Sequence, residues 1–142
     1  MNLTRSLTVS ALLFSLGSTV AASPFMLNSG SWEFDIKYDL IGLPQTFPGY
    51  SQTQCIDSSS PFPSINRPGN ECRAQLQGQF GNTYTWTLNC SDDWEMVQGM
   101  GRVHYQQETA HGDIHLQILN PHNPPQMMEF SFKGRRVGEC GG

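Results

Sequence analysis

Residues 32–40 (WEFDIKYDL) constrain the fold of this chain more than any other segment, because large apolar and charged side chains alternate there without exception. Successive side chains of a β-strand point to opposite faces, so this segment is predicted to be a strand with one buried and one solvated face. A helix would distribute the same five apolar groups around its circumference. The pattern therefore indicates an antiparallel β protein.

Residues 1–22 are predicted to be a cleaved secretory signal. Arg5 supplies the positive charge before a short apolar core at residues 7–16, and small side chains at residues 20–22 form a cleavage site. An apolar run of about ten residues is too short to span a bilayer, which needs roughly twenty. The mature chain, residues 23–142, is expected to be one periplasmic or secreted domain, with cleavage near Ala22.

The mature chain carries scattered charges of both signs, with an acidic excess. Without Arg5 it has seven basic and twelve acidic side chains, a net charge of −5. Such a surface exerts no long-range attraction on nucleic acid or on anionic lipid. Nucleic acid is therefore not expected as a partner, and no later segment is apolar enough to span a membrane.

Four cysteines lie in the mature chain: Cys55, Cys72, Cys90 and Cys140. An even number of cysteines in an exported chain predicts two disulfides, with three possible connectivities. A three-residue hairpin loop at residues 80–82 would place Cys72 opposite Cys90, within disulfide reach. This favours Cys72–Cys90 with Cys55–Cys140. The alternative, Cys55–Cys72 with Cys90–Cys140, would staple the proline-rich loop between the first two cysteines.

Turn-rich segments divide the mature chain into short strands, and no segment repeats the 3.6-residue apolar period over a helical length. The proline-rich residues 57–70 are predicted to form a loop, and the glycines at 99 and 101 predict a bulge or bend. Seven to eight short strands with regular turns predict an all-β fold, a small antiparallel β-barrel or sandwich. The predicted strands are 32–40, 50–55, 72–80, 84–90, 94–105, a strand ending near residue 118, and 127–133.

The hairpin after residue 105 is predicted to turn at His111-Gly112. Apolar positions are odd-numbered before the turn (103 and 105) and even-numbered after it (114, 116 and 118). These faces coincide when odd positions pair with even ones, as in a two-residue loop that pairs Ala110 with Asp113.

A set of short motifs follows in a fixed order along the mature chain. They are Gly30-Ser31-Trp32, Thr53-Gln54-Cys55, Cys72, Trp86 four residues before Cys90, Gly99-Met100-Gly101 before Tyr105, and the C-terminal segment from Lys133 to Cys140. In this order they resemble a family of small exported bacterial proteins known as domain of unknown function 3617. The resemblance covers nearly all of the mature chain and implies export and the fold, without an established activity.

The chain departs from this family in its histidine-bearing turn at residues 111–112. Its first hairpin also carries few methionines, where relatives often carry several. This departure weakens the inference that this chain binds metal as methionine-rich members of the family would.

No catalytic motif is present in the sequence. A G-x-S-x-G elbow, an H-E-x-x-H zinc motif, a P-loop and a dinucleotide fingerprint are all absent, and the cysteines are expected in disulfides. The carboxylates Glu33, Asp35 and Asp39 lie on the predicted solvated face of the first strand. The chain is therefore not expected to be an enzyme. A hydrolase with a site assembled from loops is the third hypothesis.

Histidines and methionines make periplasmic copper or zinc binding the alternative function, since both residue types ligate copper. His104 and His115 are expected on one polar face but roughly 13 Å apart, because His115 would lie opposite Glu108. The sequence thus predicts no specific metal site and no cofactor. The remaining candidates, for which loop placement or core packing is the expected use, are His111, His122, Met96, Met127 and Met128.

Many aromatic side chains carry inward parity, and most of them are expected to form the core. An eight-stranded barrel is just wide enough to be filled or to hold one small ligand. The leading hypothesis is therefore a non-enzymatic module that binds a small apolar ligand inside the barrel or an envelope protein at its rim. The candidate ligand-binding residues are Trp32, Phe34, Tyr38, Trp86, Tyr105 and Phe130.

Overall fold

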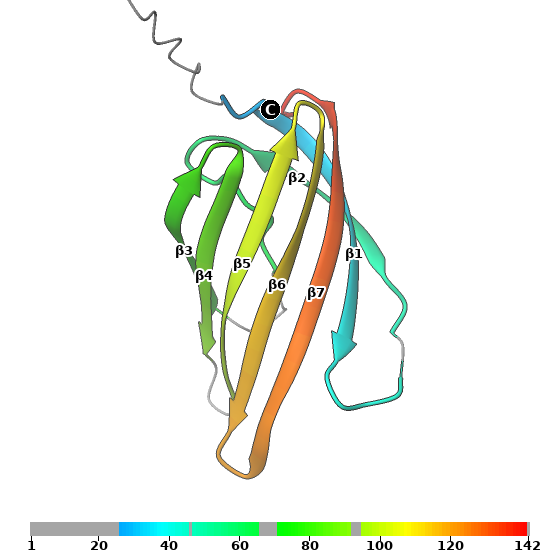
Figure 1. The fold of residues 1–142 in the computed structure, drawn as a ribbon, viewed down its shortest axis with the longest axis vertical. Helices are drawn as coiled ribbons and strands as arrows, with labels where there is room; N and C mark the ends of the chain where they lie inside the picture. Colours follow the sequence, from blue (N-terminus) through cyan, green and yellow to red (C-terminus); the bar gives the residue numbers. More distant parts are fainter. Residues whose placement is uncertain (1–25, 46, 66–70, 92–94, 142) are drawn as a thin grey trace, which may run out of the picture.

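Seven antiparallel strands in one sheet make up the fold (Figure 1). The computed structural model describes residues 26–45, 47–65, 71–91 and 95–141; the predicted signal at residues 1–22 lies outside them. The sheet order is β2-β1-β7-β6-β5-β4-β3. This confirms the all-β antiparallel prediction. The strands are β1 (Gly30–Leu40), β2 (Tyr50–Ile56), β3 (Glu71–Phe80), β4 (Thr83–Ser91), β5 (Met96–Gln106), β6 (Thr109–Asn120) and β7 (Asn123–Gly138).

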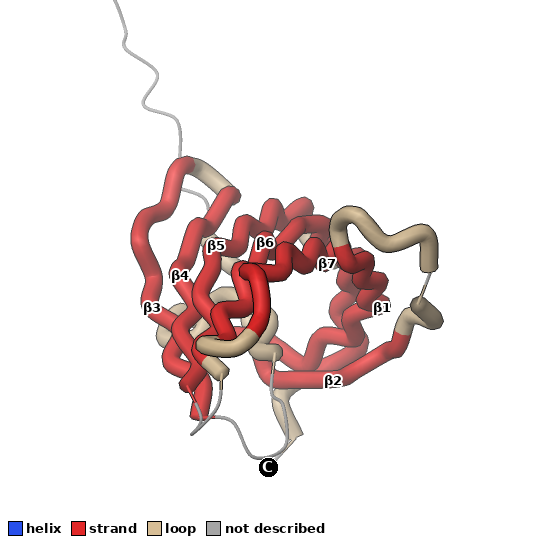
Figure 2. The backbone as a smooth tube through the Cα atoms, turned by 90° about the horizontal axis from the view of Figure 1, so that it is seen from below, coloured by secondary structure: helices blue, strands red, loops and turns tan. Residues whose placement is uncertain are grey.

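The sheet curls into an open ring (Figure 2). Strands β2 and β3 are its two edges and do not pair with each other. The predicted barrel or sandwich is therefore met only loosely, because the sheet is not closed and the described residues contain no second sheet. No helix in the described part of the chain is long and apolar enough to cross a membrane.

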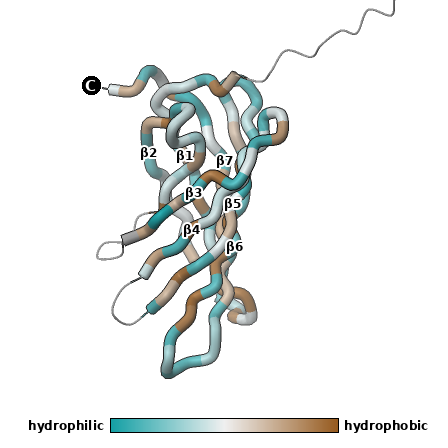
Figure 3. The backbone as a smooth tube through the Cα atoms, turned by 90° about the vertical axis from the view of Figure 1, so that its left-hand side faces the viewer, coloured by the Kyte–Doolittle hydropathy of each residue, from teal (hydrophilic) through white to brown (hydrophobic). Residues whose placement is uncertain are grey.

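Alternation of polar and apolar residues assigns the two faces of the sheet, as the colouring of β6 shows in Figure 3. In β1, residues Trp32, Phe34 and Ile36 are buried on the inner face, while Asp35 and Lys37 are exposed on the outer face. A strand buried on one face only produces this period of two.

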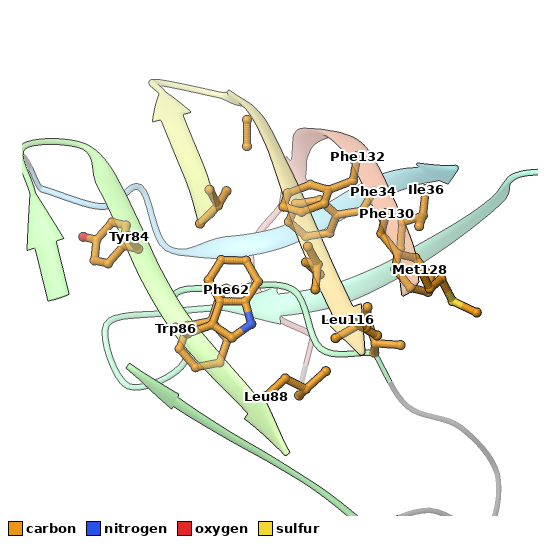
Figure 4. Packing of buried hydrophobic residues seen from close by; sticks show 14 of the residues in the cluster. Phe34, Ile36, Phe62, Tyr84, Trp86, Leu88, Leu116, Met128, Phe130 and Phe132 are labelled. Atoms are coloured by element: carbon orange, nitrogen blue, oxygen red, sulfur yellow. The ribbon is translucent and has the colours of Figure 1, made fainter. Parts of the chain in front are cut away.

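The segment 57–65 bridges the open side of the sheet. Phe62 from this segment stacks on Trp86 of β4, with ring centroids 5.0 Å apart (Figure 4). The hydroxyl of Tyr105 in β5 donates a buried hydrogen bond of 2.8 Å to the carbonyl of Pro61. Gln54 of β2 accepts from the backbone N–H of Ser64 at 3.2 Å. The predicted loop is thus a structural part of the core rather than a free connection.

A turn at Asp57 begins this bridging segment. The Asp57 carboxylate accepts hydrogen bonds from the backbone N–H groups of Ser59 and Ser60 and from the Ser59 hydroxyl. These bonds, that of the Ser59 hydroxyl first, hold the pKa of Asp57 below its ordinary value.

Glycines on the inner face make room for aromatic rings. A Cβ atom on Gly101 would lie 2.2 Å from the ring of Trp86, and one on Gly134 would lie 2.5 Å from the ring of Phe34. The predicted bulge or bend at Gly99 and Gly101 is wrong, because both glycines lie within an unbroken β5. Gly101 lies under the ring of Trp86, and Gly99 lies against the backbone carbonyl of His115.

Both favoured disulfides are present: Cys72 pairs with Cys90, and Cys55 pairs with Cys140. The predicted three-residue loop at 80–82 is wrong, because the β3–β4 turn is a two-residue Gly81-Asn82 turn that pairs Phe80 with Thr83. A register shift between Leu76 and Gly78 restores the pairing of Cys72 with Cys90. The bulge compensates for the shorter loop.

The predicted turn at His111-Gly112 is also wrong. Strands β5 and β6 are joined by a tight turn at Gln107-Glu108, in which Gln107 has a positive φ of 51°. The register keeps the predicted odd-to-even parity, so Tyr105 pairs with Ala110 and Val103 with Gly112. His111 consequently lies within β6 and not in a loop.

Candidate functional site

The six aromatic candidates form the core instead of lining a cavity. Trp32, Phe34, Trp86, Tyr105 and Phe130 are all at most 5% exposed, and only Tyr38 is half-buried. The residues pack against one another and against further rings, and Figure 4 shows Phe34, Phe130 and Phe132 grouped together. Further ring contacts join Trp32 to Tyr105 at 5.1 Å, Tyr38 to Phe47 at 5.1 Å and Tyr38 to Phe130 at 5.6 Å.

None of these six side chains lines any of the four depressions found in the described residues. A ring that already packs against other rings on the inner face has little surface left for a ligand. Inward parity therefore reflects core packing, and ligand binding by these six residues stays a prediction. The polar outer surface of the sheet offers a second place for a ligand.

The outer face of the sheet brings together two cross-strand rows of polar residues. Each row takes one residue from each of five neighbouring strands, β1, β7, β6, β5 and β4. Residues that lie directly opposite on adjacent strands have Cβ atoms about 5 Å apart, so each row is a contiguous line of side chains. The first row is Asp35, Lys133, His111, His104 and Thr83; the second is Lys37, Ser131, Asp113, Arg102 and Thr85.

A groove runs between the two rows. A depression of about 440 Å³ lies over β1, β7 and β6, and a second of about 340 Å³ lies over β6, β5 and β4. The two depressions share His111, Gly112 and Asp113, so they form one feature, which we call the outer groove. Five strands at their usual spacing make it roughly 19 Å long.

Small residues explain why the outer groove is hollow. Ser131 places a short side chain between Lys37 and Asp113 in the second row, and the side chain of Phe132 is buried on the opposite face. Gly112 allows Phe132 to approach closely, since a Cβ at this position would lie 2.4 Å from the Phe132 ring. The floor of the groove between the rows is therefore backbone.

Charges in the groove are partly neutralised within the protein. Asp113 accepts a 2.9 Å ion-pair hydrogen bond from Arg102 and lies 3.2 Å from Nε2 of His115. The Asp35 carboxylate accepts a hydrogen bond from the Ser51 hydroxyl. The lysines Lys37 and Lys133 have no ion-pair partner among the described residues.

His104 is the most constrained polar side chain of the groove. The amide nitrogen of Asn82 donates to the Tyr105 carbonyl at 2.5 Å and lies 3.1 Å from Nε2 of His104. Because this amide donates, Nε2 accepts, and Nδ1 carries the proton toward the Thr83 hydroxyl at 2.9 Å. The ring of His111 lies beside it, with centroids 5.1 Å apart.

The described residues contain no group of three or more histidine, cysteine, aspartate or glutamate side chains that could hold a metal ion. His115 pairs with Met100 rather than with Glu108, which corrects the predicted register. Because Met100 is also four residues from His104, the predicted separation of roughly 13 Å between His104 and His115 is unchanged, although the residue opposite His115 is a different one. Met128 is buried as expected, whereas Met96 and Met127 are exposed.

The sequence analysis missed the pairing of His104 with His111. A Gln-Glu turn carries no glycine or asparagine signal, and His111-Gly112 looked like the better turn. The signal that could have found it is parity: a turn at 107–108 aligns the same apolar positions and leaves a longer, fully paired strand.

A family model described as "Protein of unknown function (DUF3617)" matches residues 27–140. No curated protein and no solved structure matches the chain.

Proposed function

This chain belongs to the DUF3617 family of proteins of unknown function, and we propose that it is a non-enzymatic binding protein of an extracytoplasmic compartment. Two disulfides and the absence of free cysteines among the described residues support an oxidising compartment. The ligand or partner binds on the outer surface of the sheet, in the outer groove. The interior is occupied by the protein's own aromatic rings.

The observation that carries this proposal is the outer groove itself. Five strands contribute hydroxyl, imidazole, ammonium, guanidinium and carboxylate groups to one elongated depression. Such a surface offers both donors and acceptors along its length, as recognition of a polar, extended ligand requires. The paired strands fix the backbone positions of these groups, so that only the ordering of the side chains adds a conformational entropy cost at binding.

The arrangement of acids, histidines and hydroxyls supports a non-enzymatic role. Nucleophilic catalysis by a hydroxyl needs a histidine that is hydrogen-bonded to the hydroxyl through one ring nitrogen and to an acid through the other. Thr83 and His104 provide a hydroxyl and a histidine, but Asn82 donates to the second ring nitrogen where a carboxylate would have to accept. Asp113 and His115 provide an acid and a histidine without a hydroxyl in the described contacts. The two half-sites are separate.

Binding of copper or zinc is the second candidate function, and the adjacent pair His104–His111 is the observation that favours it. Two histidines on adjacent strands could bind one ion weakly, with water completing its coordination. Binding through Nε2 of His104 would first require displacement of the Asn82 amide.

Amide NMR spectra of the ¹⁵N-labelled protein would test where binding occurs. The probes are the dipeptide Ala-Ala and the disaccharide cellobiose for the groove, dodecanoate for the interior, and zinc chloride for the histidine pair. We expect a polar probe to shift the amides of Gly112, Asp113 and Ser131. The variant Ser131→Trp, which fills the groove, should abolish these shifts. The control is Gln98→Trp, which places the same bulky side chain in β5 on the outer face of the sheet but outside the groove.

Two results would overturn the groove as the binding site. One is saturable binding of dodecanoate with shifts at Trp86 and Tyr105, which would place the ligand inside. The other is the absence of groove shifts with both polar probes. Shifts caused by zinc and confined to His104 and His111 would favour the second candidate.

A further inference from the structure

The full chain contains two lysines, Lys37 and Lys133, and both line the same depression of about 440 Å³. Lys37 lies in β1 opposite Ser131, and Lys133 lies in β7 opposite Asp35, so the lysines occupy a diagonal across two paired strands. Arg102, farther along the groove, adds a third basic side chain. A chain with a formal net charge of −4 thus concentrates its lysines in one place.

The two ammonium groups are available to a ligand. The ion pairs among the described residues involve other basic groups: Arg102, His115, Arg135 and Arg136. Both lysines are exposed, so neither is held by core packing. An ammonium group without a carboxylate in contact keeps its donors free for an incoming anion.

The acidic residues that face these lysines are already engaged. Asp35, across from Lys133, accepts the hydrogen bond of the Ser51 hydroxyl. Asp113, across from Ser131, is bound to Arg102 and His115. The charged residues that line the groove are three basic and two acidic side chains. The exposed carboxylates Asp39 and Glu129 lie one row away on the same face, outside this lining.

We infer that the Lys37–Lys133 end of the outer groove binds the anionic group of a small acidic molecule, a carboxylate or a phosphate monoester. This deepens, and rests on, the proposed binding function. The Ser131 hydroxyl and the His111 ring lie beside the lysines and supply further hydrogen bonds. The uncharged polar remainder of the molecule extends toward His104 and Thr83 at the other end. The overall negative charge of the protein disfavours a large polyanion or an anionic membrane.

Selective ¹³C labelling of lysine gives a direct readout, because the full chain yields signals from two lysines alone. We would titrate the chain with glucuronate and glucose 6-phosphate and use glucose as the neutral probe of matched shape. Both acidic sugars should shift both lysine ε-methylene signals, and glucose should not. Each of Lys37→Gln and Lys133→Gln should weaken binding roughly fivefold, as loss of one exposed charge contact predicts.

Arg73→Gln is the matched control, because it removes one exposed positive charge from edge strand β3 outside the groove. It should leave the affinity unchanged. Lysine signals that respond to neither acidic sugar would overturn the inference, as would an equal loss of affinity in Arg73→Gln. Binding to phosphatidylglycerol vesicles in place of the sugars would likewise overturn it. If cellobiose shifts the amides of the groove but the acidic sugars leave the lysine signals unchanged, the proposed binding function is retained and only the acidic ligand is excluded.

Discussion

At the residue scale, Tyr105 holds the bridging segment 57–65 to the sheet. Its ring is fully buried between Trp32 and Tyr84, and its hydroxyl donates to the Pro61 carbonyl. This one bond links β5 to a segment that belongs to no strand. Burial, followed by the nearby Tyr84, raises the pKa of Tyr105 far above its ordinary value.

Tyr105→Phe should lower the free energy of unfolding at neutral pH by about 1–3 kcal/mol, because the buried Pro61 carbonyl loses its donor. Urea unfolding followed by tryptophan fluorescence would measure this loss. Tyr84→Phe is the control, since no hydrogen bond of the Tyr84 hydroxyl joins it to the described residues. A variant as stable as the native protein would show that the bond contributes nothing.

The same substitution should flatten the alkaline stability profile. A raised pKa in the folded state means that the unfolded chain releases the Tyr105 proton first. The contribution of Tyr105 is therefore fully present below about pH 10 and is lost as the pH rises above that value. The native protein should lose stability above pH 10 more steeply than Tyr105→Phe, in urea unfolding repeated from pH 8 to 11.

At the element scale, inward-facing glycines let β5, β6 and β7 curl around large rings. Gly101, Gly112 and Gly134 each lie against an aromatic side chain of a neighbouring strand. An aromatic ring that lies over a strand glycine fills the space its missing side chain leaves.

Gly101→Ala should destabilise the protein by at least about 2 kcal/mol, because the new Cβ would displace the buried ring of Trp86. Gly78→Ala offers a matched control in edge strand β3, where the nearest atom to a new Cβ is the Thr85 hydroxyl oxygen at 3.8 Å. The control should be neutral or slightly stabilising. Thermal unfolding by circular dichroism would compare them, and equal melting temperatures would contradict the crowding argument.

At the scale of the whole molecule, the two disulfides fix different parts of an open sheet. Cys72–Cys90 joins neighbouring strands β3 and β4 across a separation of 18 residues. Cys55–Cys140 joins edge strand β2 to the chain just after β7, across 85 residues. Edge strand β2 pairs with the sheet only through β1, and the bridging segment begins where β2 ends. The second disulfide therefore gives this edge strand a covalent attachment to the end of the chain.

Removal of Cys55–Cys140 by a double serine substitution should cost about 4–5 kcal/mol, and removal of Cys72–Cys90 about 3 kcal/mol, since the longer loop restricts the unfolded chain more. The midpoint of urea unfolding under oxidising conditions would rank the two variants against the native protein. A larger loss for the Cys72–Cys90 variant would contradict the ranking and indicate that local strand pairing, not chain entropy, dominates.

The sequence by itself determined the class of fold and the inner face of the sheet. Alternation in residues 32–40 is a local property, because side-chain direction on a strand follows from backbone geometry alone. In the middle hairpin, the three-residue loop predicted Cys72 opposite Cys90, and a two-residue turn with a bulge between Leu76 and Gly78 produces the same pairing. Even the mistaken turn at residues 111–112 preserved which residues face inward, since any odd-to-even register does so.

Only the tertiary structure decided which outward residues meet. The residue that lies opposite on the next strand depends on the register. The Gln107-Glu108 turn and the predicted His111-Gly112 turn give two registers for β5 and β6, and the partner of each β5 residue differs between them by eight positions. Parity also cannot tell a filled interior from an empty one: Phe62 packs against Trp86 from the bridging segment 57–65, a long-range contact that the sequence pattern does not predict. The groove and its two lysines join strands far apart in sequence, so only long-range pairing could place them together.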